Sequence, residues 1–166
     1  MNEVVDHLQP NLKIVFIGYN PSVRSSEQGH HYAHPSNRFW KILHAASLTP
    51  RVFHHSEDQN LLSLGYGFTN IVSRPTKAAA DITSIEYDEG RVLLQQKLGI
   101  YLPKVAFYVG KGVYQQLTKR KKIYWGKQEE SVVGGVIDFV APSSSGLVRM
   151  NIDEMSAIYQ QLNRYI

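Results

Sequence analysis

Runs of consecutive apolar residues predict the strands of this chain. The first predicted strand, Leu12–Ile17, contains the four consecutive apolar residues Ile14–Ile17 and ends at Gly18, and a second run, Val105–Val109, is apolar throughout. Short apolar runs bounded by turn residues are typical of strands covered on both faces. Two further β-prone stretches, Phe68–Val72 and Val136–Val140, complete a predicted set of strands.

Segments with helical spacing separate these strands. The apolar positions predict helices over Pro35–Ala46, Ser56–Leu64, Tyr87–Tyr101, Val113–Lys119 and Ile152–Tyr165. Strands that alternate with helices are typical of a parallel sheet with helices on both faces. We therefore expect one α/β domain over residues 1–166, a three-layer α/β/α sandwich around a central, mostly parallel four-stranded sheet.

Polar loops follow the predicted strands. In open α/β sheets such loops converge at the carboxyl edge of the sheet, where ligands bind. The loop over residues 20–36 is long and rich in Ser, Gly and His, and loops of this length are functional or disordered. The others are Asn70–Thr76, Gly110–Gly112 and Pro142–Arg149.

Asn20 directly follows the first predicted strand. Its amide can donate and accept hydrogen bonds but does not titrate, so it suits positioning a group rather than removing its proton. Asn20-Pro21 is also ordinary turn chemistry, and the dipeptide alone favours a simple turn.

Composition narrows the possible partners and cofactors. The 18 Lys and Arg against 14 Asp and Glu give a net charge of +4, which permits a polyanionic partner without establishing one. The absence of cysteine excludes disulfides and cysteine-ligated iron–sulfur clusters and fits a reducing compartment. With no leader-like or membrane-spanning pattern, we expect a cytoplasmic protein, associated with the nucleoid if it is bacterial.

Several short motifs are incomplete. His30, His31 and His34 lack the helical spacing or cysteine partners of a zinc site, so no metal site is expected. Gly110-Lys111-Gly112 could seat a phosphate but lacks the P-loop pattern. The Ser-rich loop Pro142–Gly146 lacks the Gly-x-Ser-x-Gly pattern of a hydrolase nucleophile.

An ordered set of motifs carries a family resemblance. They are Gly18-Tyr19-Asn20-Pro21-Ser22, His30-His31-Tyr32, Pro35-Ser36-Asn37-Arg38-Phe39-Trp40-Lys41, Gly67-Phe68-Thr69-Asn70, Arg74-Pro75-Thr76, Trp125-Gly126-Lys127 and Pro142-Ser143-Ser144-Ser145-Gly146-Leu147. Together they resemble the mismatch-specific uracil/thymine-DNA glycosylases of the uracil-DNA glycosylase superfamily, from Leu12 to the last helix. Tyr19 and Ser22 depart from the Gly-Ile-Asn-Pro-Gly form of the first motif.

The resemblance implies a base pocket. Asn20 would position the attacking water, and Thr76 would help to hold it. Tyr32 would stack on a flipped base, which the enzyme must first extrude from the duplex. Asn70, Ser25 and His31 would complete the substrate-binding residues.

The resemblance also implies a DNA contact surface. Leu147, with Gly146, would form the wedge that fills the vacated stack. Arg149 would join the wedge or contact a phosphate, or it is simply a cation that flanks the last helix. Ser143 and Lys111 would hold phosphates, contacts that position DNA without reading its sequence.

The expected function is a monofunctional DNA glycosylase that removes uracil mispaired with guanine in double-stranded DNA, with thymine or modified pyrimidines as further candidate substrates. No lysine suggests Schiff-base chemistry, no cofactor is implied, and nothing demands more than a monomer. The alternative is a non-catalytic binder of damaged or abasic DNA, which the departure at Ser22 keeps open. A module for free nucleotides is disfavoured because no phosphate-cradling motif is complete.

Overall fold

The centre of the fold is strand β1, Ile14–Gly18, in a computed structural model that describes residues 2–166. All five residues of β1 are buried, which explains why its apolar positions do not alternate with polar ones. β1 pairs in parallel with β2, Tyr66–Asn70, on one side and with β3, Val105–Val109, on the other.

The sheet has the strand order β2-β1-β3-β5-β4. Strand β5, Ile137–Ala141, is parallel to β3, whereas β4, Gly126–Lys127, is antiparallel to β5. The predicted mostly parallel sheet is therefore confirmed, but the expected number of four strands is wrong, because five are present. The sequence missed β4 because two residues are too few to form an apolar pattern.

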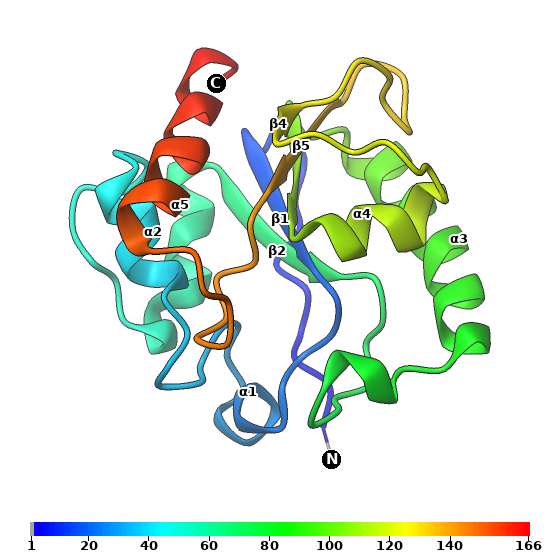
Figure 1. The fold of residues 1–166 in the computed structure, drawn as a ribbon, viewed down its shortest axis with the longest axis horizontal. Helices are drawn as coiled ribbons and strands as arrows, with labels where there is room; N and C mark the ends of the chain where they lie inside the picture. Colours follow the sequence, from blue (N-terminus) through cyan, green and yellow to red (C-terminus); the bar gives the residue numbers. More distant parts are fainter. Residues whose placement is uncertain (1) are drawn as a thin grey trace.

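Helices cover both faces of the sheet, as the sequence predicted (Figure 1). Helices α2, Phe39–Ala45, and α5, Ile152–Gln160, lie on one face, and α3, Ser84–Tyr101, and α4, Lys111–Thr118, lie on the other. Three 3₁₀ segments complete the described elements: η1, His55–Leu64, η2, Ala79–Asp81, and η3, Gln161–Arg164. The predicted helix over Ser56–Leu64 is thus a 3₁₀ segment.

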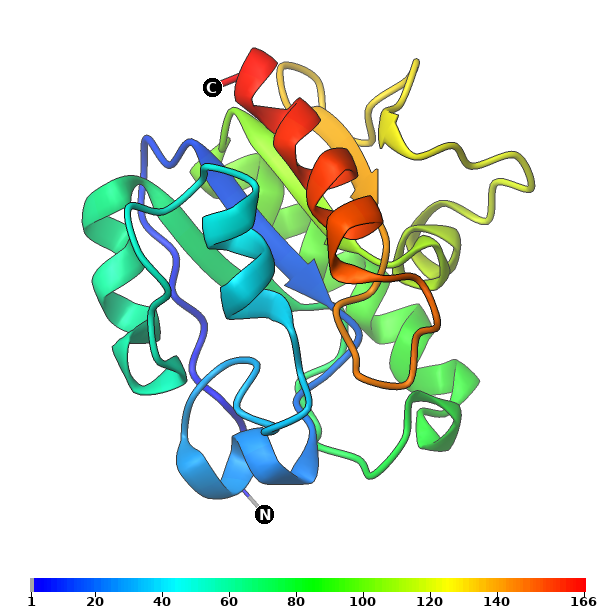
Figure 2. The same ribbon diagram turned by 60° about the vertical axis from the view of Figure 1, so that its left-hand side comes forward.

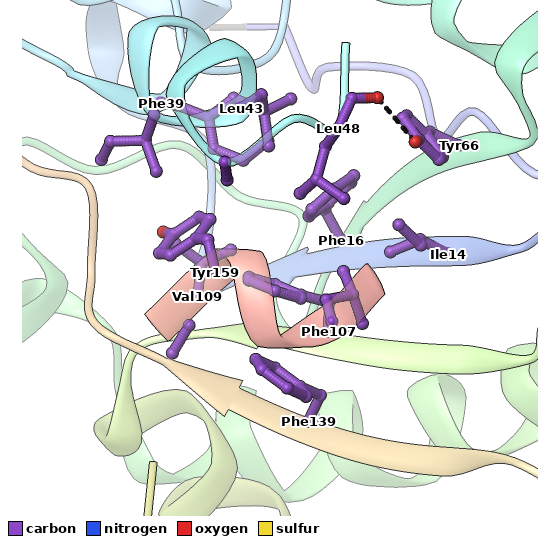
Figure 3. Packing of buried hydrophobic residues seen from close by; sticks show 14 of the residues in the cluster. Ile14, Phe16, Phe39, Leu43, Leu48, Tyr66, Phe107, Val109, Phe139 and Tyr159 are labelled. Atoms are coloured by element: carbon purple, nitrogen blue, oxygen red, sulfur yellow. Dashed lines mark hydrogen bonds between the residues drawn. The ribbon is translucent and has the colours of Figure 1, made fainter. Parts of the chain in front are cut away.

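Two apolar cores lie on the two faces of the sheet. On the α2–α5 face, Phe16, Phe107 and Phe139 project from β1, β3 and β5 toward Phe39 and Tyr159 (Figure 3). Fully burying a Phe side chain contributes roughly 2–3 kcal/mol. Because neighbouring strands present rings to one another, the strands at the centre of the sheet form a rigid base for their terminal loops.

The polar segment over residues 20–36, expected to be a loop, contains a short helix, α1, Val23–Gln28. Ser22 caps its first turn by accepting a hydrogen bond from the Ser25 backbone, and Gly29 ends it in the left-handed conformation. The sequence carries both signals, but a single turn and a half has too few apolar positions to show a helical period.

The carboxyl ends of the parallel strands lie at one end of the molecule. The chain leaves β1 toward β2 on one side and later returns to β3 on the other, so the strand order switches at β1. Helix α1 and the loop before α5 lie at this same end (Figure 2). Within residues 2–166, none of the helices is long and apolar enough to cross a membrane.

Candidate active site

A cavity of about 450 Å³ opens at the carboxyl ends of β1, β2 and β3 and beside the loop that follows β5. This is the switch point, where open α/β sheets bind ligands. The predicted site residues in its lining are Asn20, Ser25, His31, Tyr32, Asn70, Thr76, Ser143, Gly146 and Leu147. The structure therefore brings together residues that are scattered over most of the chain, whereas Lys111 and Arg149 are not part of the lining.

The side-chain amide of Asn20 is held by two acceptors. Its Nδ2 donates to Thr76 Oγ1 at 2.8 Å and to the Arg74 carbonyl oxygen at 2.8 Å. Since both amide hydrogens are engaged, Oδ1 is the atom of Asn20 that remains to accept a hydrogen bond from a ligand or a water. The Thr76 hydroxyl donates to the Ala78 carbonyl at 2.7 Å, so its proton is also committed. Thr76 thus orients Asn20.

Ser22 and Ser25 hold the segment after Asn20 in place. Ser22 caps α1 and forms an isolated parallel bridge with Thr76. The buried Ser25 Oγ accepts hydrogen bonds from the Ser22 hydroxyl at 3.1 Å and from the Ala33 backbone at 3.1 Å. Ser22 therefore has a local role in capping α1, and Ser25 ties α1 to the turn that carries Tyr32.

Tyr32 lies in this turn with a φ of 51°, a left-handed conformation that is uncommon for a tyrosine. Its ring stacks on Phe39, with centroids 4.0 Å apart and planes 11° from parallel. Because Phe39 covers one face of the ring, only the opposite face can stack against a ligand. The hydroxyl is buried without a hydrogen-bond partner among residues 2–166, and burial raises the pKa of Tyr32 well above its usual value.

Gly18 permits a close approach between two walls of the cavity. A Cβ atom at this position would lie 2.7 Å from Asn70 Oδ1 and 3.3 Å from the Tyr32 hydroxyl. The side chain of Asn70 makes no hydrogen bond with another part of the described chain (residues 2–166), so its amide is available to a ligand.

His31 is almost completely buried behind Tyr32, with 4% of its surface exposed. Its Nε2 lies 2.8 Å from the Val5 carbonyl oxygen, to which it must donate, and its backbone N–H donates to Asp58 Oδ2 at 2.8 Å. Burial lowers the pKa of His31 to about 4. His31 is therefore an uncharged, anchored wall of the cavity near neutral pH.

The loop over residues 143–150 forms the opposite rim and carries Leu147, whose surface is 94% exposed. We call it the rim loop. The guanidinium of Arg38 donates to the rim-loop carbonyls of Met150 at 2.8 Å, Val148 at 2.8 Å and Ser145 at 3.0 Å. The rim loop is therefore fixed by its backbone, and Leu147 itself is left in solvent.

Gly146 brings the rim loop against the segment before α2. A Cβ atom at Gly146 would lie 2.8 Å from the Cβ, carbonyl oxygen and hydroxyl of Ser36. Lys111, at the start of α4, places its Nζ 4.2 Å from the centre of the exposed Trp125 ring. Arg149 is exposed on the rim loop.

Sequence reasoning missed several residues of the site. Lys77 lines the cavity next to Thr76, although the sequence suggested no lysine for Schiff-base chemistry. Arg38 was part of a motif, but its contacts with the rim loop were not predicted. Its partners lie more than 100 positions away, and they are backbone carbonyls, which every residue has whatever its type. Further lining residues outside the predicted set include Tyr19, His34, Asn37, Ser144 and Ser145.

Comparisons with known proteins identify the family. A family model described as the uracil DNA glycosylase superfamily matches residues 5–166. The fold is similar to the solution NMR structure of a protein from Methanosarcina acetivorans that is described as a candidate uracil DNA glycosylase. The two chains are 18% identical, 98% of each is covered, and the TM-score is 0.60, so this likeness supports the fold. From the match over nearly its whole length, the chain belongs to the uracil DNA glycosylase superfamily.

Proposed function

We propose that this glycosylase is monofunctional and removes uracil mispaired with guanine in double-stranded DNA. The observation that carries the proposal is the clamped amide of Asn20, whose Oδ1 is left for a water at the edge of a cavity large enough for a base. We also propose that it acts as a monomer, since nothing in the sequence demands more than one chain.

In the proposed reaction, uracil leaves the stack and enters the cavity. The free face of Tyr32 stacks on the base, and the Asn70 amide binds its polar edge. The oxygen of a water held by Asn20 Oδ1 then bonds to the C1′ carbon of the deoxyribose as the bond from C1′ to uracil N1 breaks. The electron pair of that bond leaves on uracil, and the proton of the water passes to solvent.

Because Asn20 does not ionise, it cannot act as a full base. Departure of the uracil anion must then be favoured electrostatically, by donors aimed at the charge that develops on the base. The Asn70 amide and the backbone N–H groups of Asn20 and Ser22 are candidate donors among the residues that line the cavity. The net charge of +4 further favours the approach of DNA.

On the DNA side, the exposed Leu147 would fill the space that the flipped base vacates, as apolar wedges do in other DNA-binding proteins. Backbone groups near Gly146 would face the unpaired guanine. Ser143, Lys111 and Arg149 would contact phosphates around the cavity. Lys111 and Arg149 do not line the cavity, which fits contacts with the phosphates of the DNA backbone rather than with the flipped base.

Single-turnover excision on a G:U duplex tests the role of Asn20. We expect Asn20→Ala to lower the rate about 100-fold or more, while duplex affinity is retained. Thr76→Ala should lower the rate by about tenfold, the effect of one lost orienting hydrogen bond, and Thr76→Ser should restore it. Asn60→Ala, on the exposed surface of η1, is the matched control. Unchanged excision by Asn20→Ala would exclude the proposed mechanism.

The same assay, with and without alkali, distinguishes the remaining possibilities. A strand break that needs no alkali, together with borohydride trapping lost in Lys77→Ala, would show a bifunctional enzyme. Retained binding without excision would favour the non-catalytic binder, although Ser22, which kept that alternative open, has a local role as the cap of α1. Duplexes with A:U, G:T and single-stranded uracil establish whether the mismatch is required.

A further inference from the structure

Three residues from distant parts of the chain meet behind the candidate active site. His7, His31 and Asp58 each offer a ligand atom, and these atoms lie within 4.8 Å of one another. His31 is the buried wall of the cavity, whereas His7 and Asp58 do not line it. None of the steps proposed above uses His7 or Asp58, so this cluster can be considered independently of the proposed function.

Each member of the cluster is anchored by the backbone. His7 exchanges two backbone hydrogen bonds with Phe68 of β2, at 2.9 and 3.0 Å. His31 follows α1, and its backbone N–H donates to Asp58 Oδ2. Asp58 lies in η1, where Oδ1 accepts from Gln59 N–H and His30 Nδ1. The cluster thus joins three parts of the chain: the segment before β1 (residues 2–13, here called the N-terminal segment), the turn before Tyr32, and η1.

Two features of the cluster call for a cation. Asp58 is 1% exposed, and within residues 2–166 no Lys or Arg forms an ion pair with it; the side chain that contacts its carboxylate is the imidazole of His30, 3.0 Å away. Burial of a carboxylate is costly unless it is paired or coordinates a metal. In addition, His7 Nδ1 is a buried nitrogen without a hydrogen-bond partner in this part of the chain.

The hydrogen bonds around the cluster leave the required lone pairs free. Asp58 Oδ2 accepts one hydrogen bond, from His31 N–H, and so retains acceptor capacity. The Nε2–H of His31 donates to the Val5 carbonyl, which leaves Nδ1 as the unprotonated nitrogen. A histidine that donates one ring N–H to a carbonyl and binds metal through the other nitrogen is the usual arrangement in metal sites.

We propose that His7, His31 and Asp58 form a binding site for a divalent transition metal of the zinc type. Two imidazoles and one carboxylate are a ligand set that Zn²⁺ accepts, with water in the fourth position. Tetrahedral ligands about 2.0–2.2 Å from Zn²⁺ lie about 3.3 Å apart, so ligand atoms that lie within 4.8 Å of one another must draw together by up to about 1.5 Å. His7, the least buried of the three, is the member that moves. The bound metal would fasten the N-terminal segment to η1 and to the turn before Tyr32.

Zn²⁺ titration of the full chain, followed by calorimetry and by thermal unfolding, tests this site. We expect one ion to bind per chain and the unfolding temperature to rise. His7→Gln should weaken binding by at least about tenfold, while excision without added Zn²⁺ stays unchanged. The matched control is His55→Gln, because the neighbouring His54 and His55 rings, with centroids 4.0 Å apart, form the alternative histidine pair. This control should bind Zn²⁺ like the unaltered protein.

Histidine side-chain NMR of the unaltered protein supplies a second measurement that requires no variant. Zn²⁺ should shift the ring nitrogens of His7 and His31 and should leave those of His34 and His44 in place. Failure of Zn²⁺ to bind, binding lost in His55→Gln but kept in His7→Gln, or ring shifts confined to other histidines would each overturn the proposal.

Discussion

The contacts of Arg38 predict that it controls duplex binding through the rim loop. Its guanidinium holds the carbonyls of Ser145, Val148 and Met150, and its backbone N–H donates to the Ser144 carbonyl at 3.0 Å. Arg38→Met keeps most of the aliphatic stem and removes the three side-chain hydrogen bonds, whereas Arg38→Lys keeps the charge but cannot span three acceptors.

The size of the effect follows from these bonds. A hydrogen bond from a charged donor contributes about 1.5–3 kcal/mol, so three would reach roughly 5–9 kcal/mol if they were additive. Contacts in one network are not additive, and the carbonyls of a surface loop can turn to water. We therefore expect Arg38→Met to release the rim loop at a cost of about 2–3 kcal/mol, which corresponds to a roughly 30- to 150-fold loss in affinity for contacts that the loop makes.

The assay compares the Kd for a duplex that carries an abasic-site analogue opposite guanine with the single-turnover rate at saturating enzyme. Arg38→Met should raise the Kd and leave the saturated rate within about threefold, because the Asn20 clamp does not involve Arg38. In the background of Leu147→Ala, the same change should cost much less, since the two residues act through one loop. A normal Kd for Arg38→Met, or full additivity with Leu147→Ala, would refute this reasoning.

Two further predictions concern packing and pH. Gly146→Ala should weaken duplex binding, because the new methyl group meets Ser36 at 2.8 Å, and Gly134→Ala, which meets no atom within 4 Å, is its control. For pH, the pKa of His31 is about 4 in the folded state against an ordinary 6.5, so the unfolded chain binds the proton more readily. Above about pH 6.5 the neutral form of His31 prevails in both states, and the free energy of unfolding keeps the full contribution of this shift. As the pH falls toward 4, the free energy of unfolding decreases by roughly 3 kcal/mol.

Urea denaturation with a metal chelator, at several pH values between 7 and 4.5, measures this loss. In His31→Gln, whose amide can still donate to the Val5 carbonyl, the dependence of the unfolding free energy on pH should be shallower. An equal dependence in both proteins would contradict the assignment to His31. If Gly146→Ala binds the duplex as tightly as Gly134→Ala, the rim loop accommodates the added methyl group and the prediction for Gly146 is wrong.

Much of the fold was predictable from the sequence because its strands are buried on both faces. Strand β3, Val105–Val109, has the predicted bounds, and β1 and β5 differ by a few residues. Helix α1 and strand β4 were not predicted, because their stability comes from caps and from a neighbouring strand rather than from an apolar period of their own.

The site was predictable only in part, and for a physical reason. Side chains such as Asn20 and Tyr32 belong to local motifs, so the sequence could propose them, although their roles remain predictions. The contact of Asn20 with Thr76 joins positions 56 apart, and the meeting of His7 with Asp58 depends on how the first residues of the chain run along β2. Such pairings arise from tertiary structure and have no signature in a linear pattern.

The bridge between His7 and Phe68 has a consequence for the behaviour of the protein at high concentration. β2 is an edge strand, and an uncovered edge can pair with the edge of another molecule and start aggregation. The N-terminal segment occupies part of this edge through the two backbone hydrogen bonds of His7, and the opposite edge, β4, is only two residues long. The described N-terminal residues up to His7 (residues 2–7) therefore help to keep the molecules apart, and their removal should lower solubility before it lowers the stability of the core.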